Sequence, residues 1–344
     1  MSDYPCIVQF PHPQKEHELT SCEKKATPLV KEWNNGQHRR KFLRAKGMCV
    51  SDNNILSVEK DILFWGEWEP YSEVEILQGN TKSPKSPMYV HKPFLKVKKN
   101  GNLHYYIHHQ PKAISESDKA KLSCTDRSCI KSNRSNTDPF VFGNYFIYSC
   151  CRQFTKNKEN GNFKYSSMKS LQKGSLILFG SSFLNPQGED SYFALDTVFV
   201  VGESRLFHVK SHENDLAGFI PPYYAEIMGY GNWDGNPEMR CYHGATIDDP
   251  INGMYSFVPC KSCSSDTRSW GFERPKLRAS MFESITDGSK NIINVNSSRN
   301  FRTFGERRCA FFDEEMVYQV WQTVRQQVIN QGYEIGVKVN FEIR

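Results

Sequence analysis

The segment Thr137–Gly202 constrains the fold of this chain more than any other part of the sequence. It contains three apolar runs rich in Phe, Tyr, Val and Ile, and Gly, Asn, Pro and Ser residues bound each run. This composition is typical of β-strands rather than of helices. The third run holds Asp196 among apolar neighbours, where an ionised carboxylate is unfavourable unless something binds it. The segment predicts a strand-rich centre in which Asp196 either contacts a ligand or pairs with an arginine such as Arg152.

The rest of the chain predicts fewer regular elements. The basic residues of His38–Gly47 indicate a helix that Gly47 ends, and strands are expected at 54–58 and 61–69. Polar stretches at 78–93 and 115–139 indicate loops, and an apolar stripe predicts a helix from Asp313 to Gly332, followed by a strand over 333–343. We therefore expect an α+β fold, with a curved, mainly antiparallel sheet or small barrel, flanking helices and long loops.

Two stretches inside 140–203 resemble the PUA-like superfamily, which includes the EVE and ASCH domains. They read Lys173-Gly174-Ser175-Leu176-Ile177-Leu178-Phe179 and Val198-Phe199-Val200-Val201-Gly202. The family has a Lys-Gly turn with an acidic or polar residue before an apolar strand, and a return strand that ends near Val-Gly. The resemblance implies a small barrel that reads a nucleic acid or a modified base in an aromatic pocket. We therefore expect three regions: a basic N-terminal region with aromatic strands (1–135), a PUA-like strand core (136–218) and a loop-rich C-terminal region (219–344).

Charge is unevenly spread along the chain. Between Lys82 and Arg134 there are twelve lysines or arginines but only three acidic residues, an excess of nine positive charges. Because the net charge of the whole chain is +6, the remainder carries a net charge of −3. Such asymmetry is typical of proteins that contact a polyanion, although a solvated insert would show it too. The basic residues expected to bind phosphates are His38, Arg39, Arg40, Lys41, Arg44, Lys96, Lys98 and Lys99, with a solvated basic face as the alternative for the helix.

Aromatic and acidic residues suggest a base-binding site. Along an extended chain, Trp65 and Glu67 share one face and Trp68 lies close by on the other. Aromatic faces stack on bases, and a carboxylate can accept a hydrogen bond from an amino edge. Core tryptophans beside solvated glutamates would give the same pattern. The predicted ligand-binding residues are Trp65, Glu67, Trp68, Tyr148, Arg152 and Asp196.

The cysteines indicate reduced thiols, some of which are candidate metal ligands. Their number is odd, eleven, and their spacing is irregular, which disfavours a disulfide framework. A Cys-x-His at Cys241 and His243 and a Cys-x-x-Cys at Cys260 and Cys263 offer four ligands that suit tetrahedral zinc. Thiols with a purely structural role are the alternative.

The main functional prediction is the binding of a nucleic acid or a nucleotide-like ligand by a soluble, cytoplasmic, prokaryotic protein. No run approaches 18 apolar residues and the first residues contain no leader, so no membrane partner is expected. Two alternatives remain. One is an enzyme acting on a nucleotide or on DNA, such as a glycosylase or an ADP-ribosyltransferase, since Arg240-Cys241-Tyr242-His243-Gly244 and Ser256-Phe257 loosely resemble elements of the latter. The other is a structural subunit of a larger assembly.

Overall fold

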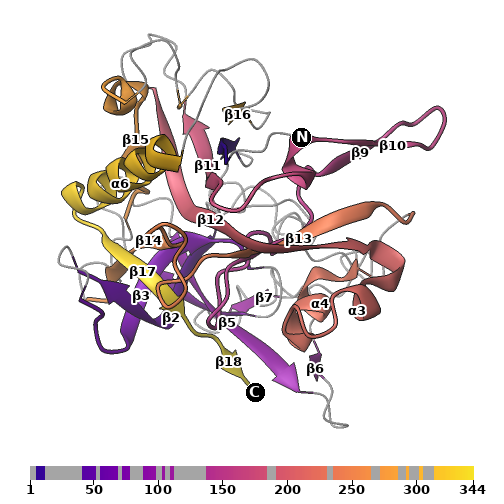
Figure 1. Cartoon of the computed structure of the whole chain (residues 1–344). Helices are drawn as coiled ribbons and strands as arrows, with labels where there is room; N and C mark the ends of the chain where they lie inside the picture. Colours follow the sequence, from indigo (N-terminus) through magenta and orange to yellow (C-terminus); the bar gives the residue numbers. More distant parts are fainter. Residues whose placement is uncertain are drawn as a thin grey trace.

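The described residues form two large β-sheets, a separate two-stranded hairpin and few helices, as the computed structural model in Figure 1 shows. The structure describes residues 5–11, 41–51, 55–68, 72–77, 88–97, 103–104, 109–111, 137–183, 191–230, 235–264, 272–285, 292–293, 302–304 and 314–344. No helix in these ranges is long and apolar enough to cross a membrane.

Four strands of the first sheet close into a small antiparallel barrel. They are β2 (Lys41–Val50), β3 (Lys60–Gly66), β14 (Val258–Ser262) and β17 (Glu334–Val339). Strand β2 pairs with β3, β3 with β14 and β14 with β17, and β17 returns to β2. The sheet continues beyond this ring through β5 (Met88–Val97), β4 (Ser72–Leu77) and β7 (His109–Pro111), with β6 (Leu103–His104) and β18 (Glu342–Ile343) also on β5.

The second sheet is built around one long strand, β12 (Tyr192–His208). Its first half pairs with β11 (Leu176–Phe183) and β15 (Lys276–Leu277), and its second half pairs with β13 (Glu238–Gly244). The sheet is completed by β1 (Ile7–Pro11) and β16 (Arg302–Phe304) beyond β11, and by β8 (Ile147–Tyr148) beyond β13. A separate hairpin is formed by β9 (Phe154–Lys156) and β10 (Phe163–Tyr165).

The one long helix of the described residues is α6 (Glu314–Asn330), which confirms the predicted C-terminal helix. Its buried stripe is Val317, Val320, Trp321, Val324 and Val328. Gly332, with a φ of 78°, ends the turn that leads into β17. The shorter helices are α3 (His212–Asp215) and α4 (Pro222–Met228), and the 3-10 helices are η3 (Ser167–Lys169), η4 (Val209–Ser211) and η6 (Ala279–Phe282).

Strands β11 and β12 separate two apolar cores, because successive side chains of a strand point to opposite faces. Ile177 and Phe179 face one core, called the main core below, which contains the interior of the barrel and α4. Leu176 and Leu178 face the second core, which lies under α6. The predicted strands in this segment are therefore confirmed at β11 and β12. The first apolar run provides only the two residues of β8.

The helix predicted over His38–Gly47 is wrong in its described part, because Lys41–Val50 forms strand β2. Leu43, Ala45 and Cys49 lie in the main core, while Lys46 between them is exposed, a period of two. Gly47 does not end a helix: a Cβ atom there would lie 2.7 Å from the backbone oxygen of Lys338. Glycine is present because β2 and β17 approach closely at this point.

Two further local predictions need correction. Residues 55–59 form no strand, although Leu56 makes one isolated bridge to Val50. The loop predicted over 78–93 is wrong from Met88 onward, where strand β5 begins. By contrast, the strand predicted at 61–69 is confirmed as β3, and the last strand as β17 and β18.

The strands of each large sheet come from distant parts of the chain. Barrel strands come from 41–66, 258–262 and 334–339, and the segment 136–218 contributes strands to the second sheet instead. Of the expected curved, mainly antiparallel sheet or small barrel, the small antiparallel barrel is present, in a mostly β fold with few helices. The fold is more heavily β than the predicted α+β mixture.

Candidate nucleic-acid interface

The β9–β10 hairpin projects from the body of the molecule (Figure 1). Its turn is closed by backbone hydrogen bonds from Asn157 to Asn162 (2.8 Å) and from Gly161 to Asn157 (2.9 Å). The side chains of Asn157 and Asn160 each accept a further bond from the amide two residues on, at 2.8 and 3.0 Å. Gly161 has a φ of 73°, which glycine adopts without strain. The sequence thus specifies a tight, hydrogen-bonded tip.

The base of the hairpin is firmly attached to the second sheet. The rings of Phe154 and Phe163 meet edge to face, with 5.3 Å between their centroids. Phe163 also covers Gly235, where a Cβ atom would lie 2.8 Å from the ring. The hydroxyl of Tyr165 accepts a bond from the Glu238 amide at 3.2 Å. Because these contacts fix both strands, side chains near the tip are held away from the body at a defined position.

The charged side chains exposed on this hairpin are mainly basic. Lys156, Lys158 and Lys164 are exposed, and Glu159 is the single acidic residue from Phe154 to Tyr165. None of the three lysines lies within 4.0 Å of a carboxylate in the described part of the chain. Their ammonium groups are therefore available to an anionic partner.

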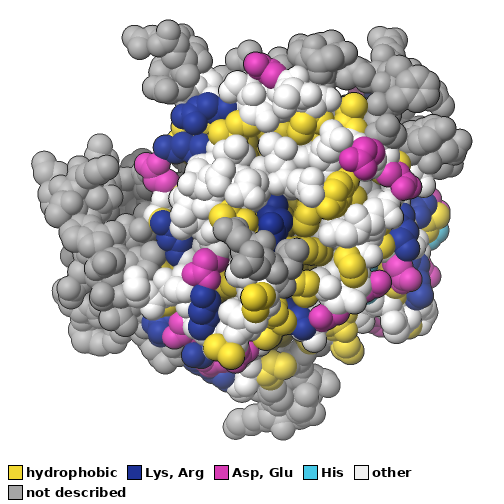
Figure 2. Space-filling model, turned by 60° about the vertical axis from the view of Figure 1, so that its left-hand side comes forward, with side chains coloured by type: hydrophobic (Ala, Val, Ile, Leu, Met, Phe, Trp, Pro, Cys, Tyr) yellow, Lys and Arg dark blue, Asp and Glu magenta, His cyan; other side chains and the backbone are white. Residues whose placement is uncertain are grey.

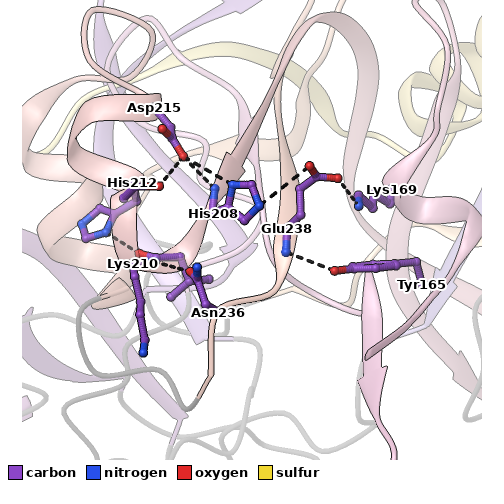
Figure 3. A network of polar contacts seen from close by, with 10 residues as sticks. Tyr165, Lys169, His208, Lys210, His212, Asp215, Asn236 and Glu238 are labelled. Atoms are coloured by element: carbon purple, nitrogen blue, oxygen red, sulfur yellow. Dashed lines mark hydrogen bonds and ion pairs between the residues drawn. The ribbon is translucent and has the colours of Figure 1, made fainter. Parts of the chain in front are cut away.

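A polar network continues from the hairpin base to helix α3 (Figure 3). Lys169 lies 3.6 Å from the centroid of the Tyr165 ring and 2.6 Å from the Glu238 carboxylate. Its hydrogen bond holds the pKa of Glu238 below the usual range. The imidazole of His208 stands between Glu238 and Asp215, with a ring nitrogen 3.9 Å from each carboxylate. Because the two carboxylates face different ring nitrogens, the three residues cannot hold one metal ion together.

Asp215 ties the end of β12, where His208 lies, to helix α3. Its carboxylate accepts bonds from the His208 amide (2.8 Å) and the Ser211 hydroxyl (2.6 Å), and these bonds lower the pKa of Asp215. The His212 ring contacts the Val209 carbonyl oxygen at 2.7 Å, and the Lys210 amide donates to Asn236 at 2.8 Å, as Figure 3 shows. These contacts order the surface beside the hairpin.

The side of the molecule shown in Figure 2 differs in its charge pattern. There, the described basic and acidic side chains are interspersed with each other and with apolar ones. Such a surface provides no concentrated positive field for a polyanion. The hairpin is the more suitable candidate.

Asp196 is buried as expected, but its partner is Arg274 and not Arg152. The Arg274 guanidinium lies 2.8 Å from the Asp196 carboxylate and donates to the Ser181 hydroxyl at 3.1 Å. Arg152 is exposed, and its guanidinium carbon lies 5.8 Å from the centroid of the Phe10 ring. Asp196 therefore has a structural role in the described fold.

The aromatic residues predicted to hold a base lie in different parts of the core. Trp65 packs in a small cluster with Phe42, and its indole nitrogen donates to the Phe272 carbonyl oxygen at 2.9 Å. Trp68 and Tyr148 belong to the main core, where Trp68 meets Phe142 and Tyr148 stacks on Tyr242. Glu67 is also buried. The described residues bring no shared pocket together from this set.

The predicted phosphate-binding residues are only partly described. Lys41 is buried and donates to the Trp68 carbonyl oxygen, and Arg44 pairs with Asp61 at 2.8 Å. Both basic groups are thus engaged within the fold. Lys96 lies in β5, and the remaining residues fall outside the described ranges: His38, Arg39, Arg40, Lys98 and Lys99.

The predicted zinc ligands do not converge. Cys241 is fully buried in the main core, and the His243 ring stacks on Phe219 with 4.2 Å between centroids. Cys260 lies in the barrel with its sulfur 3.5 Å from that of Cys49, while Cys263 packs beside the Trp65 cluster. The first motif lies on β13, and the second lies at the end of β14 and just after it. These strands belong to different sheets, so the spacing of the motifs along the chain does not correspond to proximity.

The residues behind the ADP-ribosyltransferase alternative are also engaged in the fold. Arg240 donates through Nε to the Lys169 carbonyl oxygen at 2.9 Å, and its other hydrogen bonds connect it to Ser204 and Gln153. Ser256 is buried, and its hydroxyl oxygen accepts a bond from the Val200 amide at 3.0 Å.

Sequence reasoning missed the hairpin lysines. The segment Lys156-Asn157-Lys158-Glu159-Asn160-Gly161-Asn162 contains an Asn-Gly pair next to aromatic strand residues, a strong signal for a hairpin. That signal could have identified a projecting basic element. No protein-family model, no curated protein and no solved structure matches this chain.

Proposed function

We propose that this protein binds nucleic acid through the β9–β10 hairpin. The observation that carries the proposal is the exposure of Lys156, Lys158 and Lys164 on an anchored hairpin with a single acidic residue. Lysines that contact phosphates release condensed counterions, which favours binding to a polyanion regardless of its sequence. A two-stranded ribbon also has dimensions that the major groove of a DNA duplex admits. Duplex DNA is therefore the proposed partner.

The PUA-like resemblance supports the same class of ligand. Its apolar residues lie in the first half of β11 and the middle of β12, in the sheet from which the hairpin extends. The proposal does not include a base pocket made from Trp65, Trp68 and Asp196, because these side chains are buried among protein groups. Affinity would come from contacts between the lysines and the phosphate backbone of the DNA, and the network around His208 would lie beside the duplex.

Binding to a labelled duplex, measured by fluorescence anisotropy over a range of salt concentrations, tests the proposal. Replacing Lys156, Lys158 and Lys164 together by Glu should abolish measurable binding at moderate salt. Replacement of the same three residues by Arg is the matched control, because it keeps the charge, and it should bind as the wild type does. A triple Lys→Ala variant that still binds should show a salt slope smaller by roughly two to three, since each phosphate contact contributes about 0.9.

Two results would count against this function. Wild-type protein that binds neither duplex nor single strand, at any salt concentration, would exclude nucleic acid as the partner. Equal binding by the Glu and Arg triple variants would show that binding takes place elsewhere on the chain. Single-stranded DNA and RNA in the same assay distinguish the duplex from the other nucleic acids.

A further inference from the structure

Asp138, Cys150 and Cys151 bring three potential metal-ligand atoms together at the root of the hairpin. One oxygen or sulfur atom from each lies within 4.8 Å of the other two, and no other such group of three occurs among the described residues. The Cys150 sulfur is 3.1 Å from Oδ2 of Asp138. Asp138 and Cys150 are buried, whereas Cys151 is partly exposed.

The backbone holds this arrangement in place. The Asp138 carboxylate accepts amide bonds from Ser149 (2.9 Å), Cys150 (2.9 Å) and Cys151 (2.8 Å). The turn that carries both cysteines is therefore wrapped around the carboxylate. Asp138 has no ion pair with a Lys or Arg of the described chain, so its charge is opposed by neutral donors alone. A carboxyl group and two thiols that the backbone holds together are ligand types that suit a thiophilic cation.

We propose that Asp138, Cys150 and Cys151 form a binding site for a thiophilic divalent cation such as Zn²⁺ or Cd²⁺. Thiolate sulfur binds zinc at about 2.3 Å and carboxylate oxygen at about 2.0–2.2 Å, so ligands at tetrahedral angles lie roughly 3.5 Å apart. The contact between Cys150 and Asp138 is close to that separation. The cation would replace the thiol proton now between sulfur and oxygen, and both thiol protons would be released to solvent.

The partly exposed Cys151 makes the site accessible from solvent. Cys151 connects the buried pair to the surface, so a fourth ligand would be water or a group from a bound molecule. Three protein ligands with an open position are typical of reactive rather than purely structural zinc sites. This inference is independent of nucleic-acid binding, because none of the hairpin lysines belongs to the site.

Titration of the reduced, metal-free full-length protein with Cd²⁺ tests the site, since thiolate-to-cadmium absorption in the ultraviolet reports each bound thiolate. Cys151→Ser removes the most accessible ligand and should weaken binding at this site by at least about tenfold, since even the loss of a supporting group around a metal ligand typically costs ten- to a hundredfold. Cys263→Ser is the control, because Cys263 is also partly exposed but lies elsewhere. The other thiols of the chain contribute equally to the ultraviolet absorption of both variants.

Stability provides a second measurement. Cd²⁺ should raise the melting temperature of the wild type and of Cys263→Ser clearly more than that of Cys151→Ser, because the stabilisation grows with the affinity of the folded protein for the ion. Asp138→Asn is less suitable, since it could disrupt the turn itself. Identical Cd²⁺ absorption and melting shifts for the wild type and Cys151→Ser would overturn the proposal, as would a wild type that shows neither.

Discussion

Arg274 and Asp196 form an ion pair in which both side chains are almost completely buried, at 1% and 0% exposure, with 2.8 Å between guanidinium nitrogen and carboxylate oxygen. The pair connects β12 to the segment that precedes β15. Arg274 also lies below the Trp65 ring, 5.9 Å from its centroid. The acidic residue that a sequence reader would assign to a ligand instead holds two distant parts of the chain together.

Asp196→Asn should therefore destabilise the protein strongly. The substitution nearly preserves shape but leaves the Arg274 charge buried without its counterion, which typically costs about 3–5 kcal/mol. Urea denaturation measures the loss. The double variant Asp196→Leu with Arg274→Met removes both charges and should recover a large part of it. A loss below about 1 kcal/mol for Asp196→Asn would show that the pair is not a structural requirement.

A second prediction concerns the close approach of barrel strands at Gly47. A Cβ atom there would lie 2.4 Å from Cδ1 of Ile62 and 2.7 Å from the Lys338 backbone oxygen, which cannot move without opening the barrel. Gly47→Ala should destabilise the fold by about 1–3 kcal/mol, as overpacking usually does.

Gly66→Ala in the neighbouring strand is the matched control. There the nearest atoms, at 3.1 Å, are side-chain atoms of Leu43 and Phe64, which can adjust. Its effect on the free energy of unfolding should be clearly smaller than that of Gly47→Ala. Equal losses for the two variants would mean that contact with the Lys338 backbone does not decide the outcome.

A third prediction concerns acidic pH and the network beside the hairpin. The pKa of Glu238 in the folded protein is lowered from 4.5, chiefly by its hydrogen bond to Lys169. A carboxyl group with a lowered pKa contributes stability above its unfolded pKa, and this contribution is lost as the pH falls through the folded value. The wild type should therefore lose more stability than Glu238→Gln between neutral pH and about pH 3. Because the Glu238 side chain is partly exposed, the difference is modest.

Urea denaturation at several pH values, together with NMR titration of the Glu238 carboxyl group, checks this expectation. Glu159→Gln is the control, since Glu159 is exposed at the hairpin tip without a described lysine partner. It should lose stability on acidification as the wild type does. If Glu238→Gln also matches the wild type, the Lys169 contact contributes nothing to the folded state.

Local sequence patterns predicted the elements whose signal lies within one segment. The stripe of α6 repeats at helical spacing, and β11 and β12 are apolar runs bounded by turn residues, so both were predictable. Strand β2 was missed because its lysines and arginines, good helix formers, obscured the alternation of Leu43, Ala45 and Cys49. Propensity is a weak guide wherever sheet packing decides the structure.

The candidate sites show the same limit. Burial of Asp196 followed from its apolar neighbours, but its partner Arg274 is 78 residues away, and no local pattern connects them. The two expected zinc motifs are close in sequence but do not form a site, because β13 and β14 belong to different sheets. Asp138 and the adjacent Cys150 and Cys151 come together through a turn that only the hydrogen bonds define.

Closure of the barrel has a consequence for how the chain assembles during synthesis. Val50 pairs with Ile335, and Phe64 pairs with Cys260, so the β2–β3 hairpin leaves the ribosome long before the strands that cover its edges. Until then its unpaired amides and carbonyls are open to other chains, a hazard that short edges and charged side chains reduce. Lys46 and Lys60 are positioned to act in this way. The ring can therefore close only after residues 334–339 have emerged, near the end of synthesis.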